Sequence, residues 1–180
     1  MILALDSSAL ALLMNPIANP PHNPETNQPV QLVPERINLF LASLKASDTL
    51  IISTPVLAEV LVRAGDGAPG ILEALAGMGR IKVKPFGQRA AVETAMMTQQ
   101  AIDAGDKKAG SGAPWQKVKV DRQIIAVARV EGATAIYSDD GDLIAFAKAL
   151  GMEVVSTWTL PLPESEANLF SAMGLDDEPI

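Results

Sequence analysis

The sequence contains no cysteine and a single histidine, His22. Without cysteine, neither a disulfide framework nor a thiolate zinc site is possible. With one histidine, which lies among prolines, a histidine general base or a multi-histidine metal site is effectively excluded. Acid–base chemistry, if present, therefore falls to carboxylates or to water activated by a metal ion.

An excess of basic residues is also missing. The 14 Lys and Arg residues are outnumbered by 21 Asp and Glu, which gives a formal net charge of -7. A protein that coats DNA or RNA is normally basic. Any contact with nucleic acid must therefore rest on a local basic patch or on bound cations.

Long apolar runs are absent as well, and no segment approaches the roughly 20 apolar residues that span a bilayer. The start, residues 1–6, lacks a basic segment and reaches an acid at once, so a signal peptide is not expected. A hydrophobic fraction of 48% and a mean hydropathy of +0.22 argue against disorder. We expect a cytoplasmic protein without a membrane partner, whose 180 residues form one domain.

Short apolar runs alternate with segments of helical periodicity along most of the chain. The pattern predicts strands at residues 2–5, 49–53, 81–83, 134–137 and 153–155. Helices are predicted at residues 7–14, 35–46, 54–63, 68–76, 88–103, 120–131 and 143–150. Such alternation favours an α/β fold with a mostly parallel central sheet flanked by helices.

Three segments are predicted to lie outside this framework. Residues 15–34 contain six prolines, a density that disfavours regular structure and predicts a loop insertion within the domain. Residues 105–116 are rich in glycine and lysine and are predicted to be a flexible loop. We expect a single domain over residues 1–160 and an acidic tail over residues 161–180.

Carboxylates recur directly after the predicted strands. Asp6 follows the first strand and Asp121 lies near a helix start, where helix capping is an alternative role for each. Three acids occur within residues 139–142, which is more than capping needs. Glu59 lies in an apolar helix, and its alternative role is an ion pair with Arg63 at the i, i+4 spacing.

The predicted topology brings these acids to one place. In an open α/β sheet, ligands bind beyond the carboxyl ends of the strands. Clustered carboxylates repel one another unless a cation neutralises them, and oxygen ligands suit Mg²⁺ or Mn²⁺. Because such ions activate water and stabilise charge on a phosphate, the chemistry indicated is phosphodiester hydrolysis.

Four sequence blocks resemble those of the PIN domain family, and within it the VapC-type ribonuclease toxins of toxin–antitoxin modules. Each block is degenerate, but their order and their placement after strands make the set specific. The blocks are Leu5-Asp6-Ser7-Ser8-Ala9-Leu10, Ser53-Thr54-Pro55-Val56-Leu57-Ala58-Glu59-Val60, Asp121-Arg122-Gln123-Ile124-Ile125-Ala126-Val127-Ala128 and Ile136-Tyr137-Ser138-Asp139-Asp140-Gly141-Asp142-Leu143.

The resemblance implies a PIN-like three-layer sandwich and a Mg²⁺- or Mn²⁺-dependent endoribonuclease. It further implies a homodimer and an antitoxin protein as partner. By position in the blocks, the catalytic acids would be Asp6, Glu59, Asp121 and Asp140. The metal ligands would be Asp6, Asp121, Asp140 and the auxiliary Asp142, with Ser7 and Ser138 as supporting polar groups.

The most basic stretch of the chain lies beside one of these acids. It is interpreted as an RNA-binding strip with one aromatic stacking platform, as in single-strand binders. The alternative is a solvated loop and helix face. The residues concerned are Lys107, Lys108, Trp115, Lys117, Lys119 and Arg122.

Three other functions are compatible with clustered acids. A non-catalytic PIN-fold interaction module and a DNA-directed nuclease remain open. A phospho-acceptor receiver domain needs a lysine after its last strand, and residues 154–157 supply none. The high hydrophobic content further predicts an exposed apolar surface for dimerisation, antitoxin binding or both.

Overall fold

The structure, a computed structural model, describes residues 1–17 and 19–162. Five parallel strands form its sheet in the order β3-β2-β1-β4-β5. The strands are β1 (Ile2–Leu5), β2 (Thr49–Ser53), β3 (Ile81–Lys84), β4 (Ala135–Tyr137) and β5 (Glu153–Val155). No helix within the described ranges is both long enough and apolar enough to span a bilayer.

The central strands are apolar runs because both of their faces are covered. Leu5, Ile52 and Tyr137 are completely buried, and Leu5 pairs in register with both of the others. One residue further along each strand stand Asp6, Ser53 and Ser138. Polar side chains therefore meet at the carboxyl edge of the sheet, as predicted from topology.

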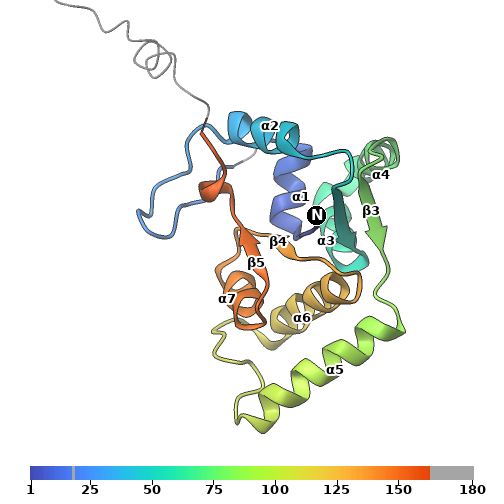
Figure 1. The fold of residues 1–180 in the computed structure, drawn as a ribbon, viewed down its shortest axis with the longest axis vertical. Helices are drawn as coiled ribbons and strands as arrows, with labels where there is room; N and C mark the ends of the chain where they lie inside the picture. The colour runs from blue at the N-terminus through green and yellow to red at the C-terminus, as the bar shows by residue number, and fades with distance from the viewer. Residues whose placement is uncertain (18, 163–180) are drawn as a thin grey trace, which may run out of the picture.

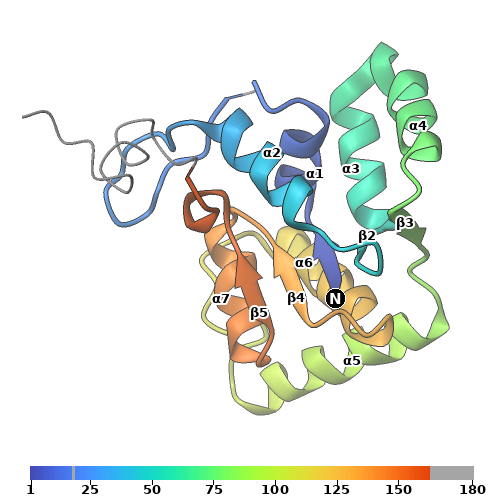
Figure 2. The same ribbon diagram turned by 45° about the horizontal axis from the view of Figure 1, so that its top comes forward.

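Seven α-helices complete the described part, with short 3₁₀ turns at Gly65–Gly67 and Thr157–Thr159. In Figures 1 and 2, α1 and α2 lie on one side of the sheet and α5, α6 and α7 on the other. The α/β prediction, with helices flanking a parallel sheet, is confirmed. The helices are α1 (Ser7–Met14), α2 (Val33–Ser43), α3 (Thr54–Ala64), α4 (Ala68–Gly77), α5 (Gln88–Asp103), α6 (Trp115–Val130) and α7 (Gly141–Ala149).

The start of α6 differs most from the sequence-based prediction. The helix begins at Trp115 rather than at residue 120, with Pro114 at the N-cap position. Proline fixes the backbone just before a helix without needing an N–H partner. The predicted flexible loop 105–116 is thus shortened at its end, and Lys117 and Lys119 are helical.

That loop is also ordered by its own hydrogen bonds. The Asp106 carboxylate accepts the backbone N–H groups of Lys108 at 2.9 Å and Gly110 at 2.7 Å. These bonds hold the pKa of Asp106 below its usual value. Gly110 has a positive φ of 82°, a conformation that glycine adopts without strain.

Smaller differences occur at two other helices. Ser53 caps α3, and Thr54 Oγ1 accepts the Phe86 N–H at 3.0 Å. Pro34 lies in the first turn of α2, so the proline-rich loop ends before it. Within residues 15–17 and 19–32, His22 and Pro29 form an isolated antiparallel bridge. Of the predicted acidic tail, residues 163–180 lie outside the described residues.

Candidate active site

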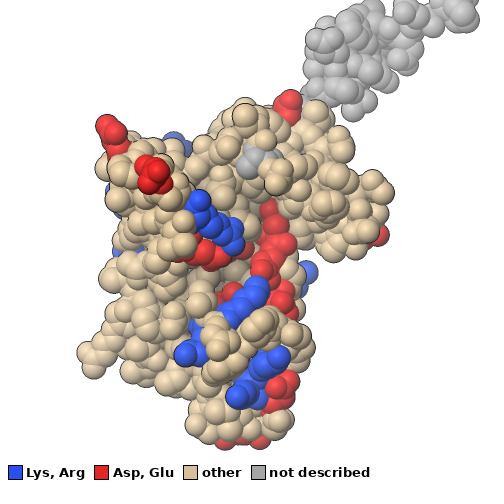
Figure 3. All heavy atoms as spheres, turned by 180° about the vertical axis from the view of Figure 1, so that it is seen from behind, with Lys and Arg blue, Asp and Glu red and all other residues tan. Residues whose placement is uncertain are grey.

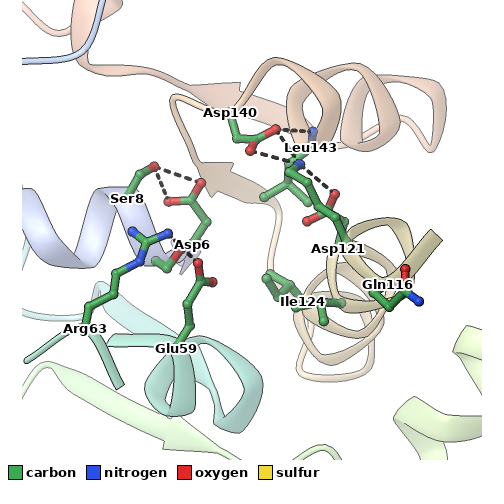
Figure 4. Close-up of a pocket in the computed structure, with 12 residues that line it drawn as sticks. Asp6, Ser8, Glu59, Arg63, Gln116, Asp121, Ile124, Asp140 and Leu143 are labelled. Carbon is green, nitrogen blue, oxygen red and sulfur yellow. Dashed lines mark hydrogen bonds and ion pairs between the residues drawn. The ribbon is translucent and has the colours of Figure 1, made fainter. Parts of the chain in front are cut away.

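A pocket of about 450 Å³ opens at the carboxyl edge of the sheet. Its lining includes the four acids predicted to be catalytic, which come from four separate segments of the chain. Figure 4 shows Asp6 and Glu59 on one side and Asp121 and Asp140 on the other. The structure therefore brings together side chains that are up to 134 residues apart in sequence (Asp6 to Asp140).

Asp6 combines the two roles that the sequence left open. Its Oδ1 accepts the Ala9 N–H at 2.7 Å and so caps α1, while the side chain also lines the pocket. Ser8 Oγ donates to Asp6, 2.8 Å from Oδ1. Ser138 Oγ donates a hydrogen bond to Oδ2. The carboxylate is only 3% exposed.

Burial dominates the protonation equilibrium of Asp6. Desolvation raises the pKa of this carboxyl from 3.8 to about 6, against the opposing effect of the hydrogen bonds from Ala9, Ser138 and Ser8. The nearby charge of Asp139 raises it slightly further. A buried carboxylate of this kind is stabilised by a nearby cation.

The supporting serines are not quite those expected. Ser138 is completely buried and bonds to Asp6 while also accepting the Asp140 N–H at 3.0 Å. Ser7 lines the pocket, but the hydrogen bond to Asp6 comes from Ser8. The Asp-x-Ser spacing, which lets a side chain turn back onto an N-cap, was the available signal.

Asp140 and Asp142 stand at the start of α7. Asp140 caps the helix by accepting the N–H groups of Asp142 at 3.0 Å and Leu143 at 3.2 Å. Asp142 accepts a hydrogen bond from Ser111 Oγ at 2.9 Å, which ties the 105–114 loop to this helix. Both side chains are about one-third exposed.

Lys117 lies among the acids rather than on an RNA-binding strip. Its Nζ is 3.0 Å from Asp121 Oδ2, 2.9 Å from Asp140 Oδ2 and 3.7 Å from Asp142 Oδ2. The early start of α6 makes this possible, because Lys117 and Asp121 are then one helical turn apart. The single positive charge of the ammonium thus offsets part of the negative charge of these three carboxylates.

These contacts change the pKa values of both Asp121 and Lys117. Burial raises the pKa of Asp121 above its usual value, although the hydrogen bond and charge of Lys117 lower it in part. Burial lowers the pKa of Lys117, but hydrogen bonds to Asp140 and Asp121 outweigh that effect and the net shift is upward. Lys117 therefore remains a cation at neutral pH.

Glu59 sits at the rim of the pocket. It forms an ion pair with Arg63 at 2.5 Å, the alternative that the i, i+4 spacing had suggested. Both residues line the pocket, and the Glu59 side chain is 37% exposed. Glu59 is therefore both paired and within reach of a bound ligand.

The donor chemistry of the pocket fits a hard divalent cation, because every candidate ligand is a carboxylate. The predicted ligand set is nevertheless not assembled around one point. Within residues 1–17 and 19–162, no three Asp, Glu or His side chains lie where a single ion could contact them all. Hydrogen bonds engage Asp6, while Lys117 engages Asp121, Asp140 and Asp142.

Asp139, the extra acid of the last block, has a structural task. It accepts the Thr157 N–H at 2.7 Å and the Thr157 hydroxyl at 2.6 Å. Thr157 in turn contacts Tyr137 OH at 2.8 Å. The network fixes the chain after β5, and burial raises the pKa of Asp139.

One residue of the predicted RNA-binding strip, Arg122, is not available to RNA. Its side chain is completely buried, donating to Thr98 Oγ1 at 3.2 Å and the Lys107 carbonyl at 2.6 Å. Its guanidinium also stacks over Trp115 at 5.5 Å. A buried guanidinium cannot contact RNA, so this assignment was wrong.

The remaining basic residues of the strip are dispersed. Lys107 lies over the Trp115 ring at 5.2 Å, and Lys108 donates to the Ala113 carbonyl at 2.7 Å. Lys119 is exposed. On the face drawn in Figure 3, acidic and basic side chains are interleaved.

Apolar side chains are exposed on two parts of the surface. They lie on α3 and α4, and again along α5. The first group contains Val62 (82% exposed), Leu72 and Met78, and the second contains Val92, Met96 and Ile102. Exposed apolar side chains are therefore present on both parts of the surface, while an apolar interaction surface stays a prediction.

No protein-family model and no curated protein matches the sequence. Solved structures do. A chain of VapBC2 from Rickettsia felis, bound to a DNA fragment from their promoter, is 15% identical with a TM-score of 0.56. The match covers 87% of this chain and 98% of that chain.

Two further structures give the same result. A chain of FitAB bound to an IR36 DNA fragment is 19% identical, with a TM-score of 0.57 over 91% of this chain and 100% of that one. A chain of DNA-bound VapBC from Salmonella typhimurium is 17% identical, with a TM-score of 0.52 over 87% and 98%. The likeness shows that this chain shares its fold with chains of VapBC and FitAB complexes, in agreement with the predicted α/β fold.

Proposed function

We propose that this protein is a Mg²⁺- or Mn²⁺-dependent endoribonuclease that acts as the toxin of a toxin–antitoxin pair. The observation that carries the proposal is the convergence of Asp6, Glu59, Asp121 and Asp140 on one pocket. The fold, shared with chains of VapBC and FitAB complexes, supports it. The exposed apolar surfaces on α3–α4 and α5 suit an antitoxin and a second copy.

A bound divalent cation would activate water and stabilise the negative charge that develops on the phosphate. Asp6, Asp121 and Asp140 would hold it, with Asp142 beside them, after their side chains turn from the contacts they make in this structure toward one point. Ser138 and Ser8 orient the Asp6 carboxylate through their hydrogen bonds.

Glu59 and Arg63 form the opposite rim. Arg63 is 61% exposed and can offer its guanidinium to a phosphate of the RNA backbone. That contact would release Glu59 from its ion pair and leave its carboxylate facing the pocket.

The experiment is a cleavage assay on defined single-stranded RNA, with DNA of the same sequence in parallel, in Mg²⁺, in Mn²⁺ and in EDTA. We expect RNA cleavage with either metal and none in EDTA. Asp121→Asn should abolish cleavage, whereas Asp66→Asn, at an exposed acid outside the pocket, should retain it. Cleavage of DNA alone, or activity that survives in EDTA, would contradict the proposal.

The toxin role is tested in cells. Induced expression of the wild-type chain should arrest bacterial growth, and the Asp121→Asn chain should not. Equal growth arrest by both chains, at equal protein levels, would show that toxicity does not depend on the acidic pocket. That result would refute the proposed role as a nuclease toxin.

A non-catalytic interaction module is the second candidate, and Lys117 is the observation that favours it. A lysine that already offsets part of the charge of three acids leaves less need for a metal ion. Calorimetric titration with Mn²⁺ distinguishes the candidates, because a binding module has no need to take up the ion.

A further inference from the structure

Lys117 brings a positive charge to the place where the acids of α6 and α7 meet. Its Nζ lies within 3.0 Å of both Asp121 and Asp140 and 3.7 Å from Asp142. The three acids come from two helices, so only the tertiary fold sets this geometry. In Figure 4, Asp121 and Asp140 lie on the same side of the pocket.

The arrangement differs from an ordinary surface ion pair. Asp121 is 13% exposed and the Lys117 side chain 36%, and one ammonium serves three carboxylates. Lys119, two residues along the same helix, is exposed and forms no ion pair within residues 1–17 and 19–162. A substitution at Lys119 therefore serves as a matched control, because it removes one lysine charge from the same helix without removing an ion pair.

We propose that Lys117 is a built-in competitor of the metal ion, displaced from Asp121, Asp140 and Asp142 when the ion binds. This inference rests on the proposed function. An ion bound to these carboxylates would lie next to the Lys117 ammonium, and the repulsion between the two positive charges opposes their sharing the site. The apparent affinity for the metal is reduced by the fraction of molecules in which Lys117 occupies the acids.

The ammonium also has a benefit for the metal-free protein. Asp121 and Asp140 lie on the same side of the pocket, each within 3.0 Å of the Lys117 amine, and their charges would repel without a cation between them. Lys117 therefore stabilises the empty site while weakening metal binding. One substitution should move these two properties in opposite directions, which loss of a merely structural lysine would not do.

The first test is Lys117→Met, with Lys119→Met as control and Mn²⁺ as the probe in isothermal titration calorimetry. We expect Lys117→Met to bind Mn²⁺ about fivefold or more tightly than wild type, since two close ion pairs no longer compete. Its metal-free melting temperature should fall while the Mn²⁺-induced rise grows. Lys119→Met should match wild type in all three measurements.

Lys117→Arg retains the charge and serves as a second variant. It should keep an affinity near that of the wild type, because the guanidinium can still pair with the carboxylates. Tight binding in Lys117→Arg as well as in Lys117→Met would show that the amine's charge is not what competes, and would overturn the proposal.

A measurement on the unaltered protein makes the test independent of variant folding. Lysine acylation followed by mass spectrometry reports how free each amine is. Saturating Mn²⁺ should raise the labelling of Lys117 severalfold and leave Lys119 unchanged. If Mn²⁺ binds and Lys117 labelling stays constant or falls, the amine is not displaced and the proposal is wrong.

The two proposals fail in different ways. If wild type binds Mn²⁺ and cleaves RNA, but Lys117→Met binds with unchanged or weaker affinity, only the competition is refuted. If neither wild type nor Lys117→Met takes up Mn²⁺, the metal-dependent function and the competition both fall.

Discussion

The two sides of the pocket stabilise their carboxylates by different means. On the β1 side, Asp6 is almost fully buried and is held by hydrogen bonds from Ala9, Ser8 and Ser138. On the α6–α7 side, Asp121 and Asp140 are more exposed and share the ammonium of Lys117.

The consequences for charge differ accordingly. Hydrogen bonds offset only part of the desolvation of Asp6, so its pKa remains raised to about 6. Lys117 supplies a full charge to the other side but occupies the oxygens that a metal ion would use. A bound metal ion would therefore stabilise the buried carboxylate of Asp6. On the α6–α7 side, the ion would have to replace the ammonium of Lys117.

The largest expected effect is the loss of RNA cleavage caused by the substitution Asp6→Asn. Asparagine caps a helix about as well as aspartate, so α1 should remain intact. Loss of a carboxylate ligand should lower metal-dependent RNA cleavage by about a hundredfold or more. Circular dichroism checks that the helix content is retained, and a cleavage assay on the same sample checks the loss of activity. Cleavage at the wild-type rate would show that Asp6 has no catalytic role.

The same variant tests the pH dependence of stability without metal. Because burial raises the folded-state pKa of Asp6 to about 6, its protonated form favours the fold. That contribution is fully present below about pH 3.8 and is lost as the pH rises through about 6. The shift corresponds to about 3 kcal/mol.

The free energy of unfolding, measured in EDTA by urea titration, should therefore fall more steeply from pH 4 to pH 7 in wild type than in Asp6→Asn. The lowered pKa values of Asp48 and Asp106 act below pH 4 and are common to both chains. Parallel curves for the two proteins would mean that Asp6 is not the titrating group.

Ser138→Ala weakens mainly the hydrogen-bonded side. It removes the bond to Asp6 and the acceptor of the Asp140 N–H, within a fully buried site. We expect a loss of about 1–3 kcal/mol in the free energy of unfolding. Ser7→Ala, at a pocket residue that does not bond to Asp6, should cost less than about 0.5 kcal/mol. Equal losses would show that the bond to Asp6 is unimportant.

The smallest expected effect on stability is that of Glu59→Gln. Its partner Arg63 is 61% exposed, and helix pairs at this spacing contribute about 0.3–0.5 kcal/mol. The melting temperature should hardly change, while RNA cleavage should drop if Glu59 serves the reaction. Unchanged cleavage would show that Glu59 only forms a surface ion pair with Arg63 and takes no part in the reaction.

Much of the site could be predicted because its signals are local. Apolar runs mark the strands, and Asp6 and Asp140 follow strands that pair with each other in a parallel sheet. Strand order then brings them to one edge. Even the pairing of Glu59 with Arg63 follows from helical spacing.

Other parts were decided by tertiary packing. Arg122 is three residues after Lys119 in a basic stretch, yet it is buried against Trp115 and Thr98 while Lys119 faces solvent. Charge alone does not tell which side of a helix faces the core. The hydrogen bonds of the buried guanidinium depend on α5 and the preceding loop, which are distant in sequence.

Lys117 combines both kinds of information. Its spacing from Asp121 was visible once α6 was known to begin at Trp115, but the contact with Asp140 joins residues 23 positions apart. The sequence by itself determined the strands, the acids that follow them and the edge where they meet, because these depend on local periodicity and parallel pairing. Only the tertiary structure decided that a lysine lies among those acids, because that depends on how α6 packs beside α7.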